Sequence, residues 1–238
     1  MTRRQTEMIA RDWSSLAGRD MFNVSVTGDG QGAPEEETGR VIARAIAEIE
    51  AAGFSREHIV RSRLFAQDKD MRTRASDCRR ALLVGPLRGS SSSFCDAERL
   101  PGHARMSLDL AAIRPRDPHA RKVVREYEPA IAPPMFVALD KLVFLSGLTD
   151  TMEHLGDQIP AIAQAIRHSL KQAGSKISAA KRVSVFLAKA EDPRKALAMI
   201  AAEFPDLPCP ITLTTVDGYS APEKRIEIEV TAAVIEGV

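Results

Sequence analysis

The sequence predicts an α+β fold made of two tandem copies of one unit. Shifting the chain by 121 residues places Gly53 on Gly174 and Phe65 on Phe186, which indicates an internal repeat. Apolar residues at spacings of three and four precede both glycines, as in an amphipathic helix. Each copy ends in a segment where apolar and polar residues alternate, which is typical of a half-buried strand.

The first copy begins with a strand over 21–27 and a helix over 38–52. Val41, Ala45 and Ile49 form the apolar stripe of that helix, and Gly53 ends it because a left-handed C-cap favours glycine. The later elements are a strand over 59–66, a helix over 71–83 and a strand over 106–110.

The second copy repeats this order and predicts a second unit of the same kind. Its expected elements are strands over 135–139 and 142–146, a helix over 159–173, a strand over 183–188, a helix over 193–204 and a strand over 226–230. Pro193 suits the first turn of its helix. Each unit is therefore expected to be a mixed β-sheet covered on one face by two helices.

The polar, proline-containing segment 114–129 separates the copies and is expected to be a linker. We therefore expect a first domain over 1–115 and a second over 116–238. The linker carries several basic residues, but nearby acids dilute them and Tyr127 is its one aromatic, so the segment does not predict a nucleic-acid surface.

Composition narrows the class of protein. The 238 residues are 44% hydrophobic and 27% charged, which is too apolar for a disordered chain. The 33 basic and 32 acidic residues leave a net charge of +1, so no chain-wide field attracts nucleic acid or anionic membrane. The sequence has no apolar run of spanning length and no export signal, which predicts a cytoplasmic protein.

Metal and disulfide chemistry have no support in the sequence. Cys78, Cys95 and Cys209 are odd in number and far apart, and no histidine cluster has metal-ligand spacing. The sequence also lacks a nucleophile elbow or a His-Glu-x-x-His motif. We therefore expect no metal site.

The second copy resembles the RidA (YjgF) family of reactive-intermediate deaminases. The similar segments are 144–147 (Phe-Leu-Ser-Gly), 172–174 (Gln-Ala-Gly), 183–187 (Val-Ser-Val-Phe-Leu) and 225–229 (Arg-Ile-Glu-Ile-Glu). The first copy is a more degenerate relative, similar at 50–53, 62–65 and 100–101. The resemblance covers nearly the whole chain and implies two RidA/chorismate-mutase-like units.

This resemblance also implies an oligomer and a reaction. RidA-like units assemble as trimers, with ligand pockets at the seams between units, so a trimer of chains is expected. Family members hydrolyse small carboxylated enamines and imines to 2-oxo acids and ammonia without a metal or an organic cofactor, so the resemblance implies no cofactor here. An arginine of a Pro-Ala-Arg-Ser motif holds the substrate carboxylate there, because a guanidinium matches that planar anion with two parallel donors.

The chain departs from the family at this arginine. Thr212 occupies its expected place in the second copy and Ser92 in the first, and a hydroxyl offers a weaker, neutral hydrogen bond. Arg88 is a possible replacement, because Pro86-Leu87-Arg88-Gly89-Ser90 reads like the family motif followed by an insertion. The alternative is that Arg88 lies on a surface turn and has no role in binding.

The remaining candidates carry both a functional and a structural interpretation. Ser146 and Gly147 match the family's pocket-lining pair, although serine and glycine are also ordinary turn residues. Glu227 matches a carboxylate that orients the attacking water or moves a proton, or it is a polar residue on a solvated strand face. The first copy has Ser107 there. Phe136 is expected to pack against ligand, unless it belongs to the core.

Three functions remain open from the sequence. The first is a deaminase-type hydrolase with Glu227 as the catalytic group and Ser146, Gly147, Arg88, Thr212 and Phe136 as substrate-binding residues. The second is a small-molecule-binding or partner-stabilising protein without catalysis, favoured by the missing arginine. A chorismatase-like hydrolase is a third, because chorismatases also resemble two such units in one chain.

Overall fold

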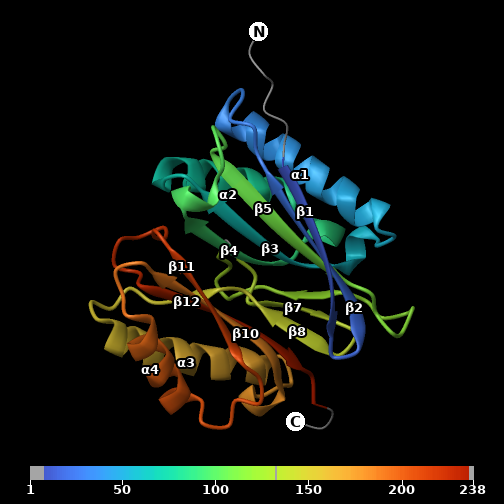
Figure 1. Ribbon diagram of the computed structural model, residues 1–238. Coiled ribbons are helices and arrows are strands. Elements are labelled where there is room, and N and C mark those ends of the chain that lie inside the picture. Colours follow the sequence, from blue (N-terminus) through green and yellow to red (C-terminus); the bar gives the residue numbers. More distant parts are fainter. Residues whose placement is uncertain (1–7, 132, 236–238) are drawn as a thin grey trace. The chain divides into compact units, whose positions relative to one another are not determined.

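The computed structural model describes residues 8–131 and 133–235 and divides into two compact units between Arg116 and Asp117 (Figure 1). The first unit contains β1 (Met8–Leu16), β2 (Arg19–Thr27), α1 (Pro34–Ala51), β3 (Ile59–Ala66), α2 (Lys69–Leu82), β4 (Ser90–Cys95) and β5 (Met106–Ile113).

The second unit contains the corresponding elements and two additional short strands. Its elements are β6 (Val123–Arg125), β7 (Phe136–Leu139), β8 (Leu142–Leu145), β9 (Leu148–Thr149), α3 (Leu155–Gln172), β10 (Ala180–Ala188), α4 (Pro193–Glu203), β11 (Ile211–Val216) and β12 (Ile226–Ala233). The expected linker is therefore not wholly irregular, because part of it forms β6 and pairs with β7.

The two sheets have the same topology. The first sheet has the order β1-β2-β5-β3-β4, and the second has β11-β10-β12-β8-β7-β6 with β9 beside β12. Each sheet has one parallel pair among its described strands. This pair is β3 with β4 in the first sheet and β10 with β11 in the second. Even the bulges correspond, since the register shifts after Ile59 in one unit and after Ala180, 121 residues later, in the other.

Local chemistry explains the helix boundaries. Pro34 begins α1, followed by three glutamates in the first turn that favour the positive end of the helix dipole. Asp68 caps α2 by accepting the backbone N–H of Met71 at 2.8 Å, and Asp192 caps α4 similarly. Gly53 and Gly174 follow the first helix of each unit at φ of 79° and 64°.

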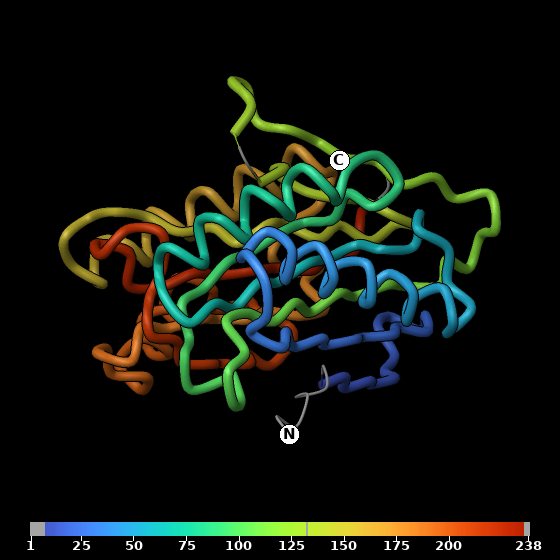
Figure 2. The backbone as a smooth tube through the Cα atoms, turned by 90° about the horizontal axis from the view of Figure 1, so that it is seen from above, coloured from blue at the N-terminus to red at the C-terminus, as the bar shows by residue number. Residues whose placement is uncertain are grey.

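Each unit has its own core between its sheet and its helices. In the first unit, α1 and α2 run alongside each other over one sheet face (Figure 2), and Arg74 of α2 pairs with Glu35 of α1 at 2.7 Å. The apolar stripe predicted for α1 is buried, with Val41, Ala45 and Ile49 at 0% exposure. The predicted α+β architecture, with two helices on one face of each sheet, is confirmed.

A buried polar side chain joins the first helix to the last long strand in both units. The carboxylate of Glu37 in α1 accepts the backbone N–H of Arg105 at 3.3 Å and pairs with its guanidinium at 2.7 Å. The side-chain oxygen of Gln158 in α3, 121 residues later, accepts the backbone N–H of Arg225 at 3.0 Å. This contact fixes the start of β5 and β12, the strand that carries the candidate site in the second unit.

Candidate active site on the second sheet

The two faces of β12 have different chemistry. Ile226, Ile228 and Val230 point into the core beneath the helices. Because neighbouring residues of a strand point to opposite faces, Glu227 and Glu229 lie on the other side of the sheet. Their exposed fractions are only 6% and 2%, so the interpretation of Glu227 as a solvated strand residue does not fit its burial.

Glu227 lies between two strands that place a hydroxyl beside it. Its register partners are Phe186 of β10 and Thr149 of β9. Directly opposed residues have their Cβ atoms about 5 Å apart and share a face, so the Thr149 hydroxyl is close to the carboxylate. The Thr149 Oγ1 atom is buried and makes no hydrogen bond within the described part of the chain. This hydroxyl can therefore serve a ligand or an ordered water.

Tyr219 adds a neutral phenol to the site. It is buried, and its hydroxyl donates to the backbone carbonyl of Phe186 at 2.7 Å. Burial raises the pKa of the phenol far above its ordinary value, and the negative charge of Glu227 raises that pKa further. Tyr219 therefore stays protonated beside Glu227.

Strands β10 and β11 extend the same polar face. Ser184 lies opposite Glu229 on one side and Thr212 on the other. In the first unit, Arg63 has the same relation to Asp109 and Ser92. Thr212 and Ser92 therefore occupy equivalent positions in the two sheets, which agrees with the alignment that places both at the family's arginine.

The loop between β8 and β9 contains Ser146 and Gly147. Ser146 is 1% exposed, and its backbone N–H donates to the carbonyl of Met135 at 3.2 Å. The chain then enters β9, which pairs with Glu227 through Thr149. Ser146 and Gly147 thus lead directly into the strand beside the carboxylate.

Two other predicted site residues lie elsewhere. Phe136 of β7 belongs to the hydrophobic core beneath α3 and α4, on the sheet face opposite Glu227. Its register partner Leu145 is part of the same core, which fits the structural interpretation of this aromatic. Arg88 belongs to the first unit, where it is half-buried just before β4.

Only the second unit has a carboxylate at the position of Glu227. In the first unit, the strand partner of Phe65 is Ser107, whereas in the second unit Phe186 pairs with Glu227. The Ser107 hydroxyl is buried and forms no hydrogen bond among the described residues. Acid–base chemistry at this position is therefore available to the second unit alone.

Sequence reasoning missed Thr149, Tyr219 and Arg182 as members of this face. Arg182 lies on β10 opposite Thr231, on the same side as Glu229. Its alignment with Arg61 in the repeat is the signal that could have drawn attention to it. Thr149 and Tyr219 lie outside the matched motifs, and their proximity to Glu227 depends on strand register and a loop path.

Within residues 8–131 and 133–235, no group of three His, Cys, Asp or Glu side chains is arranged to hold a metal ion. No helix in that part of the chain is both long and apolar enough to span a membrane.

A solved chorismatase has a similar fold over most of the chain. It matches 93% of this chain and 79% of its own length, with 12% identity and a TM-score of 0.61. The chain has a chorismatase-like tandem fold. The two units repeat one sheet topology with two covering helices, which confirms the predicted fold of two α+β units.

Single-unit proteins of this class match about half of the chain. A YjgF/YER057c/UK114 family member from Mycobacterium tuberculosis covers 48% of this chain and 99% of its own, at 21% identity and a TM-score of 0.43. A Rid family protein from Yersinia pestis has the same coverage, 20% identity and a TM-score of 0.43. No family model matches the sequence, and no curated protein matches it significantly.

Proposed function

We propose that the chain is a cofactor-independent hydrolase that deaminates small carboxylated enamines or imines. The observation that carries this proposal is Glu227, a buried carboxylate on the sheet face opposite the helices, with the Thr149 hydroxyl opposite it and the Tyr219 phenol nearby. A carboxylate in such a position can take a proton from water and return it to a leaving nitrogen.

The proposed reaction converts a 2-imino acid and water into a 2-oxo acid and ammonia. Glu227 accepts a proton as the water oxygen bonds to the imine carbon, and the C=N π electrons move to nitrogen, which gains a proton. The resulting carbinolamine collapses when its hydroxyl proton passes through Glu227 to the amine nitrogen and the C–N bond breaks. The nitrogen leaves as ammonia, and no oxidant or reductant takes part.

Substrate binding is assigned to the residues that the family resemblance selects. Ser146, Gly147 and Thr212 offer neutral hydrogen bonds, and Arg88 is proposed to supply the guanidinium that the motif position lacks. A charge-assisted pair with a carboxylate is about twice as strong per bond as a neutral one, so Arg88 is expected to set the affinity. Phe136 has no role in this proposal, because it lies in the core.

The test of catalysis compares two isosteric variants from the same strand face. Glu227→Gln is expected to lower kcat for 2-iminopropanoate by about 100-fold or more, the usual range for a lost acid–base group. Glu229→Gln is the matched control, because it also neutralises a buried carboxylate. Ammonia and 2-oxo acid release are measured together. Equal activity of Glu227→Gln and Glu229→Gln would remove Glu227 from the mechanism.

The test of substrate binding uses arginines of the first unit. Arg88→Ala is expected to raise KM about tenfold or more while kcat changes less. Arg80→Ala is the control, since Arg80 is exposed on α2 and pairs with Asp77 at 3.0 Å. An unchanged KM in Arg88→Ala would assign carboxylate binding to another group.

A non-catalytic ligand-binding or partner-stabilising protein is a second candidate, favoured by the hydroxyls of Thr212 and Ser92 where the family has arginine. This alternative predicts that 2-oxo acids raise the melting temperature, while imines and enamines are not consumed.

A chorismatase-like hydrolase is a third candidate, favoured by the fold match across both units. It predicts turnover of a cyclohexadiene carboxylate such as chorismate.

We further propose that the protein acts in the cytoplasm as a trimer of chains. The support is the resemblance to RidA-type trimers together with exposed apolar side chains on β1, an edge strand of the first sheet.

A further inference from the structure

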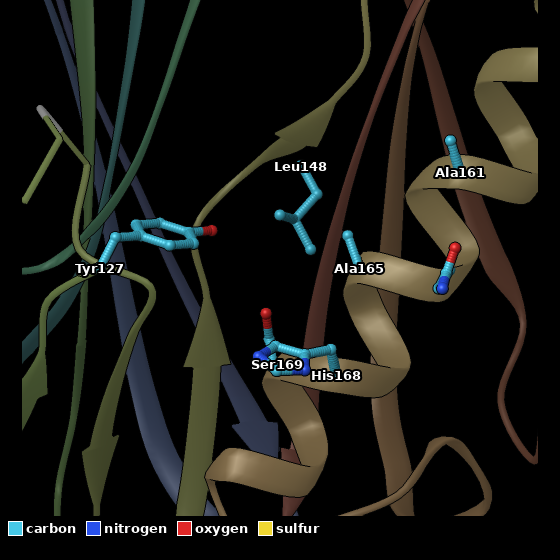
Figure 3. Close-up of a pocket in the computed structure, with 7 residues that line it drawn as sticks. Tyr127, Leu148, Ala161, Ala165, His168 and Ser169 are labelled. Carbon is cyan, nitrogen blue, oxygen red and sulfur yellow. The ribbon is translucent and has the colours of Figure 1, made fainter. Parts of the chain in front are cut away.

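A cavity lies on the helix side of the second unit, against α3 (Figure 3). Its volume is about 320 Å³, within the range of small-molecule sites. Tyr127 and Leu148 form one side. Residues of one α3 face form the other: Ala161, Gln164, Ala165, His168 and Ser169.

The cavity exists because two small side chains occupy successive turns of α3. Ala161 and Ala165 are four residues apart and lie on the same side of the helix. The neighbouring core positions Ile162 and Ile166 are filled and buried at 2% and 0% exposure. Figure 3 shows the Tyr127 ring and Leu148 facing the Ala165 side of the helix across open space.

Tyr127 supplies an aromatic wall and a neutral hydroxyl. It lies between β6 and β7 and packs against the core of the second unit. Burial raises the pKa of its phenol, and a hydrogen bond with the Ser169 side chain opposes that rise. The phenol is therefore uncharged at neutral pH and able to donate or accept a hydrogen bond.

The lining contains no Arg, Lys, Asp or Glu. Most of the lining surface is apolar, and Tyr127, Gln164, His168 and Ser169 add hydrogen-bonding groups. Such a lining does not compensate the loss of hydration that an ionic ligand suffers on entry. Flat uncharged ligands fit better, because they gain apolar burial and stacking on the Tyr127 ring.

We propose that this cavity binds a small, neutral aromatic molecule that donates one hydrogen bond, the chemistry of an indole or a phenol. The site is separate from the polar face that carries Glu227. Strand β9 divides the two, since Leu148 points to the helix side and the next residue, Thr149, pairs with Glu227 on the other face.

Titration of the intact protein with indole, followed by calorimetry, tests the proposal. Ala165→Leu is expected to fill the cavity and weaken indole binding at least tenfold. Ala201→Leu is the matched control, because it places the same side chain on an exposed position of α4 and is expected to leave the affinity unchanged. Benzoate, which is similar in size to phenol but charged, is expected to bind this cavity at least tenfold more weakly than phenol.

Tyr127→Phe is a second variant that keeps the ring and removes only the hydroxyl. It is expected to weaken indole binding by about two- to tenfold, corresponding to one net hydrogen bond. Glu227→Gln is expected to bind indole as the wild type does. No indole binding up to its solubility limit, or equal affinity of wild type, Ala165→Leu and Tyr127→Phe, would overturn the proposal.

Discussion

Tyr219 connects the candidate site to the stability of the fold through a single side chain. Its hydroxyl donates to the backbone carbonyl of Phe186, the register partner of Glu227 on β10. Tyr219→Phe leaves that carbonyl with one donor fewer. At pH 8 we expect a loss of about 1 to 3 kcal/mol in the free energy of unfolding.

The pH dependence of this loss follows from the raised pKa of Tyr219. Above about pH 10 the unfolded phenol releases its proton while the folded one keeps it, so the unfolded state binds fewer protons. The wild type then loses about 1.4 kcal/mol per pH unit from this residue, and Tyr219→Phe does not. The difference between the two proteins should shrink from pH 10 to 11.5 in urea titrations. A constant difference would contradict the buried, protonated phenol.

Single residues differ in how far the sequence determines their role. The alternation of β12 separates Glu227 from Ile226 and Ile228, so its sheet face could be predicted. Its burial could not, because strand alternation says nothing about what covers the polar face. Phe136 shows the opposite problem. The motif alignment placed it near a ligand, but its pairing with Leu145 puts it in the core.

Helix α3 depends on a buried amide at its N-terminal end. The Gln158 Nε2 atom donates to the carbonyls of Met152 at 2.5 Å and Glu223 at 2.7 Å. A carboxylate cannot donate these bonds, so Gln158→Glu is expected to lower the free energy of unfolding by about 1 to 3 kcal/mol at pH 7.

The control for this variant is Gln164→Glu, the same change at an exposed position of the same helix. Its effect is expected to stay within about 0.5 kcal/mol. Chemical denaturation at equal protein concentration measures both. Similar values for the two variants would show that the Gln158 contacts do not stabilise the unit.

Elements with a strong apolar period were predicted well, and their ends less so. The helices expected from residues 38 and 159 begin at Pro34 and Leu155. The first turn of α1 is polar and carries no apolar stripe, and Pro160 lies inside α3, where a proline usually marks a boundary. The short strands β6 and β9 also lacked a signal, because two or three residues are too few to show a period.

The whole molecule is organised by repetition, which the 121-residue offset made visible. Equal topology, matching bulges and the equivalent contacts of Glu37 and Gln158 extend that repeat well beyond the few identical residues. The residues of the candidate site are less regular, since Ser107 replaces Glu227 in the first unit. Fold was therefore predictable from pattern, whereas the site depends on single side chains that the pattern does not fix.

Association of chains is expected to involve the first sheet's edge. Trp13 of β1 is 55% exposed and packs only partly on Phe22 and Phe54, with ring centroids 5.0 and 5.6 Å away. Sedimentation equilibrium should give a mass of three 26.0 kDa chains. Trp13→Lys is expected to lower the trimer fraction, because a charge replaces an apolar edge residue.

Leu82→Lys on α2 is the matched control for this substitution, since Leu82 is also exposed but lies outside the sheet edge. It should leave the mass unchanged. A monomer at all concentrations, or equal dissociation of the two variants, would contradict association through β1.

The most direct test of the proposed chemistry is a crystal structure with bound pyruvate, the product expected from 2-iminopropanoate. Our account predicts that pyruvate lies on the sheet face that carries Glu227, with one ordered water donating hydrogen bonds to a Glu227 carboxylate oxygen and to the pyruvate carbonyl oxygen. Pyruvate bound away from Glu227, with no such water between them, would contradict the account.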